Sequence, residues 1–413
     1  MGDAMPYQPP DRLYLWYLGR PRQPALVGEL NLVMSGRGVS LRYTTHWLRQ
    51  GFALSEDLPF LEREHHPPAK DCVAGAVEDT RPGNWGERVI RLLERPPRMS
   101  LLELLYFTGD DRFGALGVSK DSDRYLPHTQ PALPSLGEVE QVHALVRKVQ
   151  IGAPMQEHER RLIAPGATMG GARPKALMQV DGQAWVLKFG EEAGSQDGLI
   201  EHASMTLASM AGIRVARTRA IALARGTAVA VERFDRAHDQ RLHAISAHVA
   251  LRAAGSEMSY PALAQWLRRR GVVTGDLHRQ DMQELFRRLV FNILIDNTDD
   301  HEKNHALLAM DNQQYRLSPA FDVLPAGQAL GYQSMGVGDD GAVSHVDNAL
   351  SMSASYGLTG REARDEAARV ARVVEGWRSH FSSLGVDGNT ITLLGDQIDR
   401  PFLLDQRKAL LSA

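Results

Sequence analysis

The chain has 413 residues, and its 47 Lys and Arg against 50 Asp and Glu give a formal net charge of −3 at pH 7. A charge this close to zero argues against nucleic-acid binding by the chain as a whole. Cys72 is the only cysteine, which excludes an intrachain disulfide and suits a reducing, cytoplasmic compartment. No run approaches the roughly 18 apolar residues of a membrane helix, and the N-terminus lacks the regions of a signal peptide. We therefore expect neither membrane attachment nor secretion.

The first part of the chain predicts a compact α+β subdomain without recognisable chemistry. Ser100 can cap a helix over the apolar run that follows it, and another helix is expected after the Pro82-Gly83 turn. Short apolar segments bounded by glycine predict strands in the ranges 12–18, 27–43 and 114–119. A proline-containing stretch, 121–136, has the composition of a linker, and a helix is expected over 137–150.

A glycine pair precedes two predicted strands in the middle of the chain. Gly170-Gly171 are followed by Lys175 at the start of one strand, and a turn at 181–182 leads to a second strand, 184–189. Glycine lets the backbone approach a phosphate closely, and exposed N–H groups with a lysine complete an anion site. A simple glycine turn before a strand has the same pattern, so this segment alone leaves both interpretations open.

The second of these strands contains a lysine among apolar residues. Burial of Lys188 in the segment VLKF costs free energy unless its ammonium group meets an anion, such as a nucleotide phosphate. An exposed strand position is the alternative. Glu201, on the next predicted helix (198–211), either orients Lys188 or is an ordinary surface residue. Two strands within 216–236 then run into the charged segment ERFDR, where a kinase would have its adenine-binding hinge.

From about residue 240 the chain is predicted to be mainly helical, and its most informative segment is 292–305, NILIDNTDDHEKNH. Asp299 precedes Asn304 by five positions, which is the spacing of the catalytic loop of protein kinases. That chemistry needs a base for the attacking hydroxyl and a Mg²⁺ ligand on one tight loop, because positioning and charge neutralisation supply most of the catalysis.

The same segment permits two other interpretations. Residues 301–305 read H-E-x-x-H, the zinc metalloprotease signature that places two histidines on one helical face. A pattern with two unrestricted positions arises by chance in a chain with 15 histidines, and no third zinc ligand is evident downstream. A solvated polar turn between two buried elements is the third interpretation.

The segment after this loop favours the kinase interpretation. A hairpin around Asp311-Asn312 is expected to deliver Phe321-Asp322, and kinases present their second Mg²⁺ ligand in this way. Asp299, Asn304 and Asp322 would then share one site. Further on, a capping box at 359–362 predicts a helix that continues through residue 380.

These motifs, in this order, resemble the HipA family of serine/threonine kinases, the toxins of bacterial type II toxin–antitoxin pairs. The matching segments are TMGGARPK, VLKF, VERFDR, NTDDHEKN and SPAFDVLP, together with N-terminal segments such as DTRPGNWGERVI and GDDRFGALGVS. The resemblance implies an α+β, bilobal kinase-like fold with an extra N-terminal α+β subdomain and a mostly helical C-terminal lobe. It divides the chain into an N-terminal subdomain (1–130), an ATP-binding core (131–239) and a catalytic lobe (240–413).

The resemblance also implies a role for each matching residue. Asp299 would be the catalytic base, and Asn304 and Asp322 would hold Mg²⁺. Family members carry an autophosphorylated serine that switches the kinase off; this chain has Thr168 at that position, a departure that puts self-inactivation in question. The implied ATP contacts are Gly170, Gly171, Ala172, Arg173, Pro174, Lys175, Lys188, Glu232, Arg233, Phe234, His301, Asn304 and Asp322.

The function implied is Mg²⁺-ATP-dependent phosphorylation of a cytosolic protein, for example an aminoacyl-tRNA synthetase, with inhibition of growth. A small helix-turn-helix antitoxin, HipB-like, would neutralise the toxin, and DNA would be contacted only indirectly through that antitoxin. Two alternatives stay open: a HipA-like kinase of an unrelated substrate without a toxin role, and a catalytically weak scaffold that binds a repressor.

Overall fold

The structure is a computed structural model that describes residues 7–128, 132–156, 159, 162–163, 171, 173–190, 192, 194–326 and 331–412. Its contacts divide the chain into two compact units. Unit 1 comprises Met1–Val186 and Asp235–Ile245, and unit 2 comprises Leu187–Phe234 and Ser246–Ala413. The α+β class expected from the sequence is confirmed, while the division at residues 130 and 239 stays a prediction.

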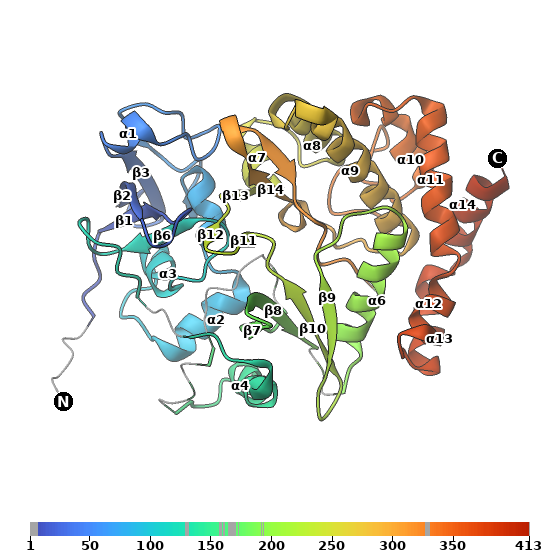
Figure 1. Ribbon diagram of the computed structural model, residues 1–413, viewed down its shortest axis with the longest axis horizontal. Helices are drawn as coiled ribbons and strands as arrows, with labels where there is room; N and C mark the ends of the chain where they lie inside the picture. The colour runs from blue at the N-terminus through green and yellow to red at the C-terminus, as the bar shows by residue number, and fades with distance from the viewer. Residues whose placement is uncertain are drawn as a thin grey trace. The chain divides into compact units, whose positions relative to one another are not determined.

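Unit 1 is built on an antiparallel sheet of order β4-β3-β2-β1-β6, with the short strand β5 parallel to β3 (Figure 1). Helix α3 packs on this sheet, and its N-terminus is closed by Ser100, the expected cap, which forms a capping box with Glu103. The elements of this unit are β1 (Arg12–Tyr17), β2 (Ala25–Val33), β3 (Gly38–Tyr43), α1 (Trp47–Gln50), β4 (Glu64–His65), β5 (Cys72–Val73), α2 (Asn84–Leu93), α3 (Leu101–Phe107), β6 (Leu116–Ser119), α4 (Val139–Ile151), β7 (Lys175–Val180), β8 (Gln183–Phe189), β11 (Arg236–Ala237), β12 (Gln240–Arg241) and β13 (Ala244–Ser246). The ends of β8 and β13 belong to unit 2.

A cluster of buried charges explains why residues 235–245 group with unit 1. The Asp235 carboxylate accepts from the backbone N–H of Gly114 at 2.8 Å and pairs with Arg236 at 2.8 Å. Arg241 pairs with the buried carboxylate of Asp110 and also donates to the Asp110 carbonyl at 2.9 Å. The burial of these charges is tolerated because each carboxylate meets a guanidinium group.

Unit 2 contains the β9–β10 pair and the last residues of β8, and helix α6 packs on β9 and β10. Most of the other elements of this unit are helices. Helix α6 packs against β9 and β10 on one side and against α11 and α12 on the other (Figure 1). Helix α9 is the central helix, because it contacts α8, α11 and α14. The elements are α6 (Asp197–Met210), β9 (Thr218–Ala222), β10 (Thr227–Glu232), α7 (Ala247–Ala253), α8 (Tyr260–Arg270), α9 (Leu277–Leu294), β14 (Ala306–Ala309), β15 (Tyr315–Leu317), α10 (Val346–Ser351), α11 (Gly360–Val374), α12 (Trp377–Ser383), α13 (Gly388–Ile398) and α14 (Pro401–Ser412).

One element differs from the sequence prediction. The helix expected to run from the capping box at Thr359 through residue 380 is two helices, α11 and α12, separated at Glu375 and Gly376. Glycine is a poor helix former, and Trp377 behind it is buried and donates to Asp399 at 3.0 Å. The buried indole therefore fixes the direction of the second helix.

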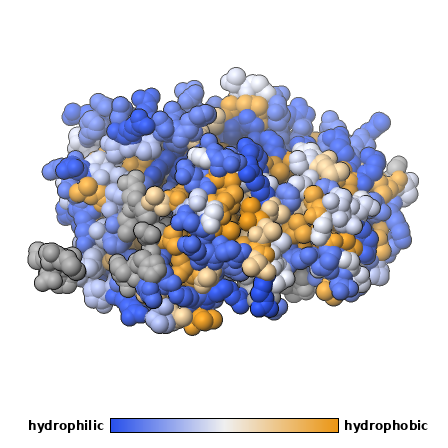
Figure 2. Space-filling view, turned by 60° about the horizontal axis from the view of Figure 1, so that its bottom comes forward, coloured by the Kyte–Doolittle hydropathy of each residue, from blue (hydrophilic) through white to orange (hydrophobic). Residues whose placement is uncertain are grey.

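No described helix is long and apolar enough to cross a bilayer. Hydrophilic residues cover most of the face drawn in Figure 2, with apolar residues interspersed. The most exposed large apolar side chains, Ile151, Leu393 and Met210, come from three different helices, and isolated residues of this kind are normal on a protein surface.

Candidate active site

Lys188 on β8 lies between two carboxylates in unit 2. Its ammonium nitrogen is 2.7 Å from Glu201 Oε1 on α6 and 2.7 Å from Asp322 Oδ1. Burial by itself would lower the pKa of Lys188, but the two carboxylates and their hydrogen bonds outweigh burial, so the pKa is raised and the lysine is charged. Glu201 is 1% exposed, which excludes its interpretation as an ordinary surface residue.

The segment that carries Asp322 is held by backbone pairing with residues before β9. The N–H of Ala320 donates to the Arg214 carbonyl at 2.7 Å, and the Ala320 carbonyl accepts from Ala216 at 2.8 Å. Asp322 follows with a φ of +59°, a left-handed conformation that aspartate adopts more readily than most residues. This backbone turn brings the Asp322 carboxylate to Lys188.

A second set of ion pairs supports this segment from α9, and the sequence analysis missed it. Asp281 accepts from Arg214, Arg316 and the backbone N–H of Leu317 at 2.7–3.0 Å. Arg288 pairs with Glu284 and donates to the Ser318 carbonyl at 2.5 Å. A local pattern was present, because Asp281, Glu284 and Arg288 are spaced by three and four positions in this helix, which places them on one face.

The loop after α9 presents one exposed carboxylate. Within residues 292–300, every side chain is buried except that of Asp299. Asn292 in the last turn of α9 holds the loop, since its backbone carbonyl accepts from the N–H of Asn297 at 2.8 Å and its amide donates to Asp300 at 2.8 Å. A carboxylate displayed on a rigid loop is the arrangement that a general base requires.

Asp300, the neighbour of Asp299, anchors the loop from inside. Its Oδ2 atom accepts from Asn292, from the ring of His305 at 2.9 Å and from the hydroxyl of Tyr260 on α8. Burial would raise the pKa of Asp300, but the charge and hydrogen bond of His305 and the Tyr260 hydroxyl outweigh it, and the pKa is lowered. Asp300 is therefore a buried carboxylate with three donors.

Asn304, the second residue of the kinase-like spacing, has an unused acceptor. Its amide nitrogen donates to the Asp299 carbonyl at 3.4 Å, while its Oδ1 atom is buried and has no hydrogen-bond partner among the described residues. A buried amide oxygen without a donor costs free energy unless something binds it. Amide and carboxylate oxygens are the ligands that Mg²⁺ prefers, so the donor set of Asn304 and Asp322 fits this ion.

The zinc interpretation of residues 301–305 does not match the structure. Residues Glu302–Asn304 form a single 3₁₀ turn, not an α-helix. Glu302 accepts from His248 at 2.9 Å, and His301 accepts from the backbone N–H of Lys303 at 3.2 Å. Within the described residues no group of three or more His, Cys, Asp or Glu side chains could hold a metal ion. Glu302 and His305 each have a specific partner in the structure, His248 and Asp300 respectively.

The predicted phosphate segment belongs to unit 1 and is described only in part. Thr168, Gly170 and Ala172 lie outside the described residues. Gly171 has a φ of +88°, and a Cβ atom placed on it would be 3.1 Å from the Lys175 ammonium nitrogen. The carbonyl of Lys175 accepts from the Trp85 indole at 2.7 Å, which fixes the start of β7. Contact of these residues, and of Arg173 and Pro174, with a phosphate stays a prediction.

The predicted hinge residues lie at the end of β10. The N–H of Glu232 donates to the Arg217 carbonyl at 2.9 Å, so this group is already used and only the carbonyl of Glu232 remains for a role with adenine. Phe234 packs on Phe321 with ring centroids 5.4 Å apart, directly before Asp322. Arg233 is buried beside them.

A lysine on a strand, a glutamate on the next helix, and a loop with Asp and Asn five positions apart are the recurring parts of protein kinases. Comparison with known proteins agrees. The model of the HipA-like C-terminal domain matches residues 167–377, just over half of the chain, and the model of the HipA N-terminal domain matches residues 23–119. The chain belongs to the HipA family of kinases.

Individual relatives are more distant. Y4dM from Sinorhizobium fredii, which carries the name of a presumed kinase, is 31% identical over 156 residues, a match that spans 35% of this chain and 37% of that protein. The HipA structure from Shewanella oneidensis MR-1, solved with HipB and operator DNA, aligns at a TM-score of 0.67 and 19% identity over 97% of both chains. The Helicobacter pylori kinase CtkA aligns at a TM-score of 0.45 and 13% identity over 59% of this chain and 92% of that one, too low to support an inference.

Proposed function

We propose that this protein transfers the γ-phosphate of ATP to a serine or threonine hydroxyl of another protein, with Asp299 as the catalytic base. The observation that carries the proposal is the cluster of Lys188, Glu201 and Asp322 in the same unit as the exposed Asp299. A buried lysine held by two carboxylates is costly as a purely structural feature. It is useful where an anion and a divalent cation bind.

The proposed step is an in-line displacement at the γ-phosphorus. The substrate hydroxyl oxygen forms the new P–O bond, the bond from the γ-phosphorus to the bridging oxygen breaks, and ADP leaves with that electron pair. Asp299 accepts the hydroxyl proton. Its exposure to solvent and its rigid backbone support this role, because a general base must reach the substrate while staying fixed in direction.

Asn304 and Asp322 would hold Mg²⁺ with the phosphates. The buried Oδ1 atom of Asn304, which has no hydrogen-bond partner among the described residues, supports this assignment, as does the contact of Lys188 with two carboxylates. Bound Mg²⁺ would neutralise charge that develops on the phosphoryl oxygens. The remaining ATP contacts that we propose are His301 and the segments 170–175 and 232–234.

We further propose that the protein is the toxin of a toxin–antitoxin pair. The fold of a HipA protein that was solved with HipB and operator DNA covers nearly the whole chain, which supports this role. The partner would be a helix-turn-helix antitoxin, DNA would be bound only through that partner, and the substrate would be a cytosolic protein, for example an aminoacyl-tRNA synthetase.

The catalytic proposal is tested by the intact mass of the purified protein after incubation with Mg²⁺-ATP, with wild type beside Asp299→Ala. We expect a gain of one phosphate in the wild type only, on Thr168. Asp299 is exposed, so the variant should unfold at the same denaturant concentration as the wild type. Undiminished phosphate transfer by Asp299→Ala would overturn the role of this residue.

The toxin proposal needs a separate test. Expression of the wild type in a bacterial host should arrest growth, whereas the Asp299→Ala variant at the same protein level should not. Co-expression of a HipB-like helix-turn-helix antitoxin should restore growth. Normal growth with an enzyme that is active in vitro would favour a HipA-like kinase with another substrate.

A further inference from the structure

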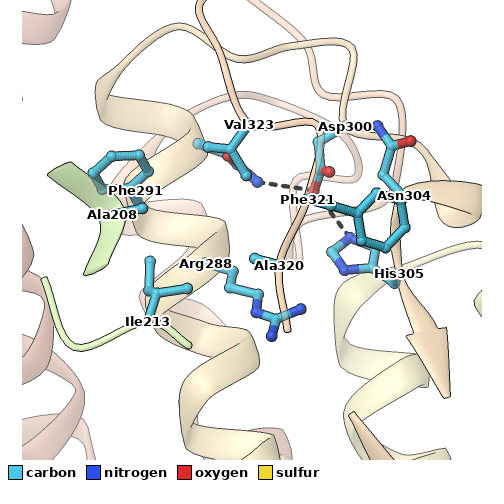
Figure 3. A pocket seen from close by; sticks show the side chains of 11 residues that line it. Ala208, Ile213, Arg288, Phe291, Asp300, Asn304, His305, Ala320, Phe321 and Val323 are labelled. Atoms are coloured by element: carbon cyan, nitrogen blue, oxygen red, sulfur yellow. Dashed lines mark hydrogen bonds and ion pairs between the residues drawn. The ribbon is translucent and has the colours of Figure 1, made fainter. Parts of the chain in front are cut away.

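A small cavity lies behind the loop that carries Asp299 and Asn304. Its volume of about 10 Å³ is close to the space that a single water molecule needs. The cavity is formed entirely within unit 2, by α6, α9, the loop and the segment before Asp322 (Figure 3). Its polar lining residues are Arg288, Asn292, Asp300, Asn304 and His305.

Besides the Asn304 oxygen, two further polar atoms of this lining are buried and have no hydrogen-bond partner among the described residues. They are Nη1 of Arg288 and Nδ1 of His305, on side chains that are 3% and 2% exposed. In Figure 3 the guanidinium of Arg288 lies below the ring of His305, and the Asn304 amide lies on the far side of that ring. Both nitrogens belong to side chains that line this one cavity.

One water molecule can satisfy both nitrogens. Nε2 of His305 is 2.9 Å from the Asp300 carboxylate, which can only accept, so Nε2 carries a hydrogen and Nδ1 is left for another partner. Nη1 of Arg288 is a donor. A water molecule can accept from Arg288 and form a second hydrogen bond with Nδ1, whereas a cation would be repelled by the guanidinium group.

We propose that this cavity binds one structural water, and that the chain Asp300–His305–water–Arg288 fixes the loop of Asp299 and Asn304 relative to the segment of Asp322. At one end of this series of hydrogen bonds, Asp300 is the sequence neighbour of Asp299, and His305 is the sequence neighbour of Asn304. The other end, Arg288, holds the Ser318 carbonyl at 2.5 Å, four residues before Asp322. Asp300 and His305 are thus positioning residues, a role that rests on the proposed kinase function.

The site itself is tested without reference to activity, by a crystal structure of the full chain. We expect electron density for one water within hydrogen-bond distance of both Arg288 Nη1 and His305 Nδ1. A dry cavity, or a His305 ring rotated so that Nδ1 has a protein partner, would overturn the proposal. This result is independent of whether the protein transfers phosphate.

The positioning role is tested by two substitutions, each of which keeps a polar group near only one of the two ring nitrogens of His305. In His305→Gln the amide nitrogen replaces Nε2, which keeps a donor to Asp300 but removes the nitrogen that would contact the water. In His305→Asn the side chain ends near the position of Nδ1, so the donor to Asp300 is lost. His248→Ala is the matched control, because it breaks the 2.9 Å contact with Glu302 of the same loop outside the cavity.

We expect kcat to fall roughly 10-fold in His305→Gln and roughly 100-fold in His305→Asn, since an error of about 1 Å in the loop has effects of this size. The dissociation constant for ATP without Mg²⁺ should stay at the wild-type value, and the control should keep its kcat. Lower stability with an unchanged kcat per folded molecule in both variants would reduce His305 to a packing role. A wild type without phosphate transfer would overturn the positioning role together with the proposed function, and the water density would still decide the site.

Discussion

Both units bury charged side chains, but they do so in different ways. In unit 1 each carboxylate of the cluster meets a guanidinium, Asp110 with Arg241 and Asp235 with Arg236. In unit 2 two carboxylates, those of Glu201 and Asp322, both contact the ammonium group of Lys188. One-to-one pairs of the first kind are sufficient for a fold. Two carboxylates on one lysine are the arrangement expected where a phosphate and a metal ion also bind.

Buried polar atoms without a hydrogen-bond partner among the described residues occur in both units. Next to the cluster of unit 2, the Asn304 oxygen, the Arg288 nitrogen and the His305 nitrogen are buried without a partner in the described part of the chain. Stability alone does not favour such atoms, since each costs free energy. Their concentration around one loop marks the region in which we expect a metal ion and an ordered water.

The largest effect is expected from Lys188→Met. Phosphate transfer should fall roughly 10²- to 10³-fold, because a preorganised positive group at the phosphates is lost. The free energy of unfolding should also fall by about 3–5 kcal/mol, since the buried Glu201 carboxylate loses its partner. Kinetic assays and urea unfolding measure the two effects separately.

The double variant Lys188→Met with Glu201→Gln sharpens this test. Neutralising Glu201 should restore part of the stability without restoring phosphate transfer. If the single variant kept wild-type transfer, the cluster of unit 2 would be structural, and the contrast between the two units would disappear.

Asp110→Ala tests the cluster of unit 1, in which each carboxylate meets a guanidinium group. It leaves the buried guanidinium of Arg241 without its carboxylate, so the free energy of unfolding should fall by about 3–5 kcal/mol. Phosphate transfer per folded molecule should not change, because Asp110 has no proposed role in the reaction. A loss of kcat at full folding would show that the two kinds of cluster do not differ in function.

Acid titration of Asp110 gives a smaller effect. Burial alone would raise the pKa of this carboxyl, but Arg241 and the Tyr125 hydroxyl outweigh burial and the pKa is lowered. A lowered pKa stabilises the folded state fully above the unfolded value of about 4, and this stabilisation is lost as the pH falls through the folded value. Between pH 5 and pH 2 the wild type should therefore lose more unfolding free energy than Asp110→Asn, by roughly 1–2 kcal/mol. If urea unfolding gave the same pH dependence of the unfolding free energy for both proteins, the lowered pKa of Asp110 would be contradicted.

Local patterns in the sequence were enough to predict most elements. The helix cap at Ser100, the turn after β7 and the hairpin before Asp322 each depend on residues within a few positions, and the structure contains all three. The break between α11 and α12 was missed because Trp377 fits the apolar stripe of one continuous helix. Its bond to Asp399, a contact over 22 positions, redirects the chain instead.

For the same reason, only part of the candidate site could be predicted from the sequence. Asp299 and Asn304 are recognised by a spacing of five positions, which is local information. The three donors to Asp300 come from α8, from α9 and from the loop, so no short pattern predicts that this carboxylate is an anchor. The pairing of Lys188 with Glu201 likewise needed the packing of α6 against the strands, which the sequence offered only as one of two possibilities.

The smallest predicted effect concerns the glycine segment of unit 1. Gly171→Ala forces a side chain into a φ of +88° and sets its Cβ atom 3.1 Å from the Lys175 ammonium nitrogen. Gly182→Ala is a matched control, because its φ of +79° carries the same backbone strain with no atom within 4 Å of the added carbon. Both variants should lose about 1–2 kcal/mol of unfolding free energy. Only Gly171→Ala should also weaken ATP binding, by a few-fold in a calorimetric titration, because it displaces the lysine that we propose for the phosphates. An equal ATP affinity in the two variants would remove residues 170–175 from the proposed nucleotide site and leave the cluster of Lys188, Glu201 and Asp322 as its only supported part.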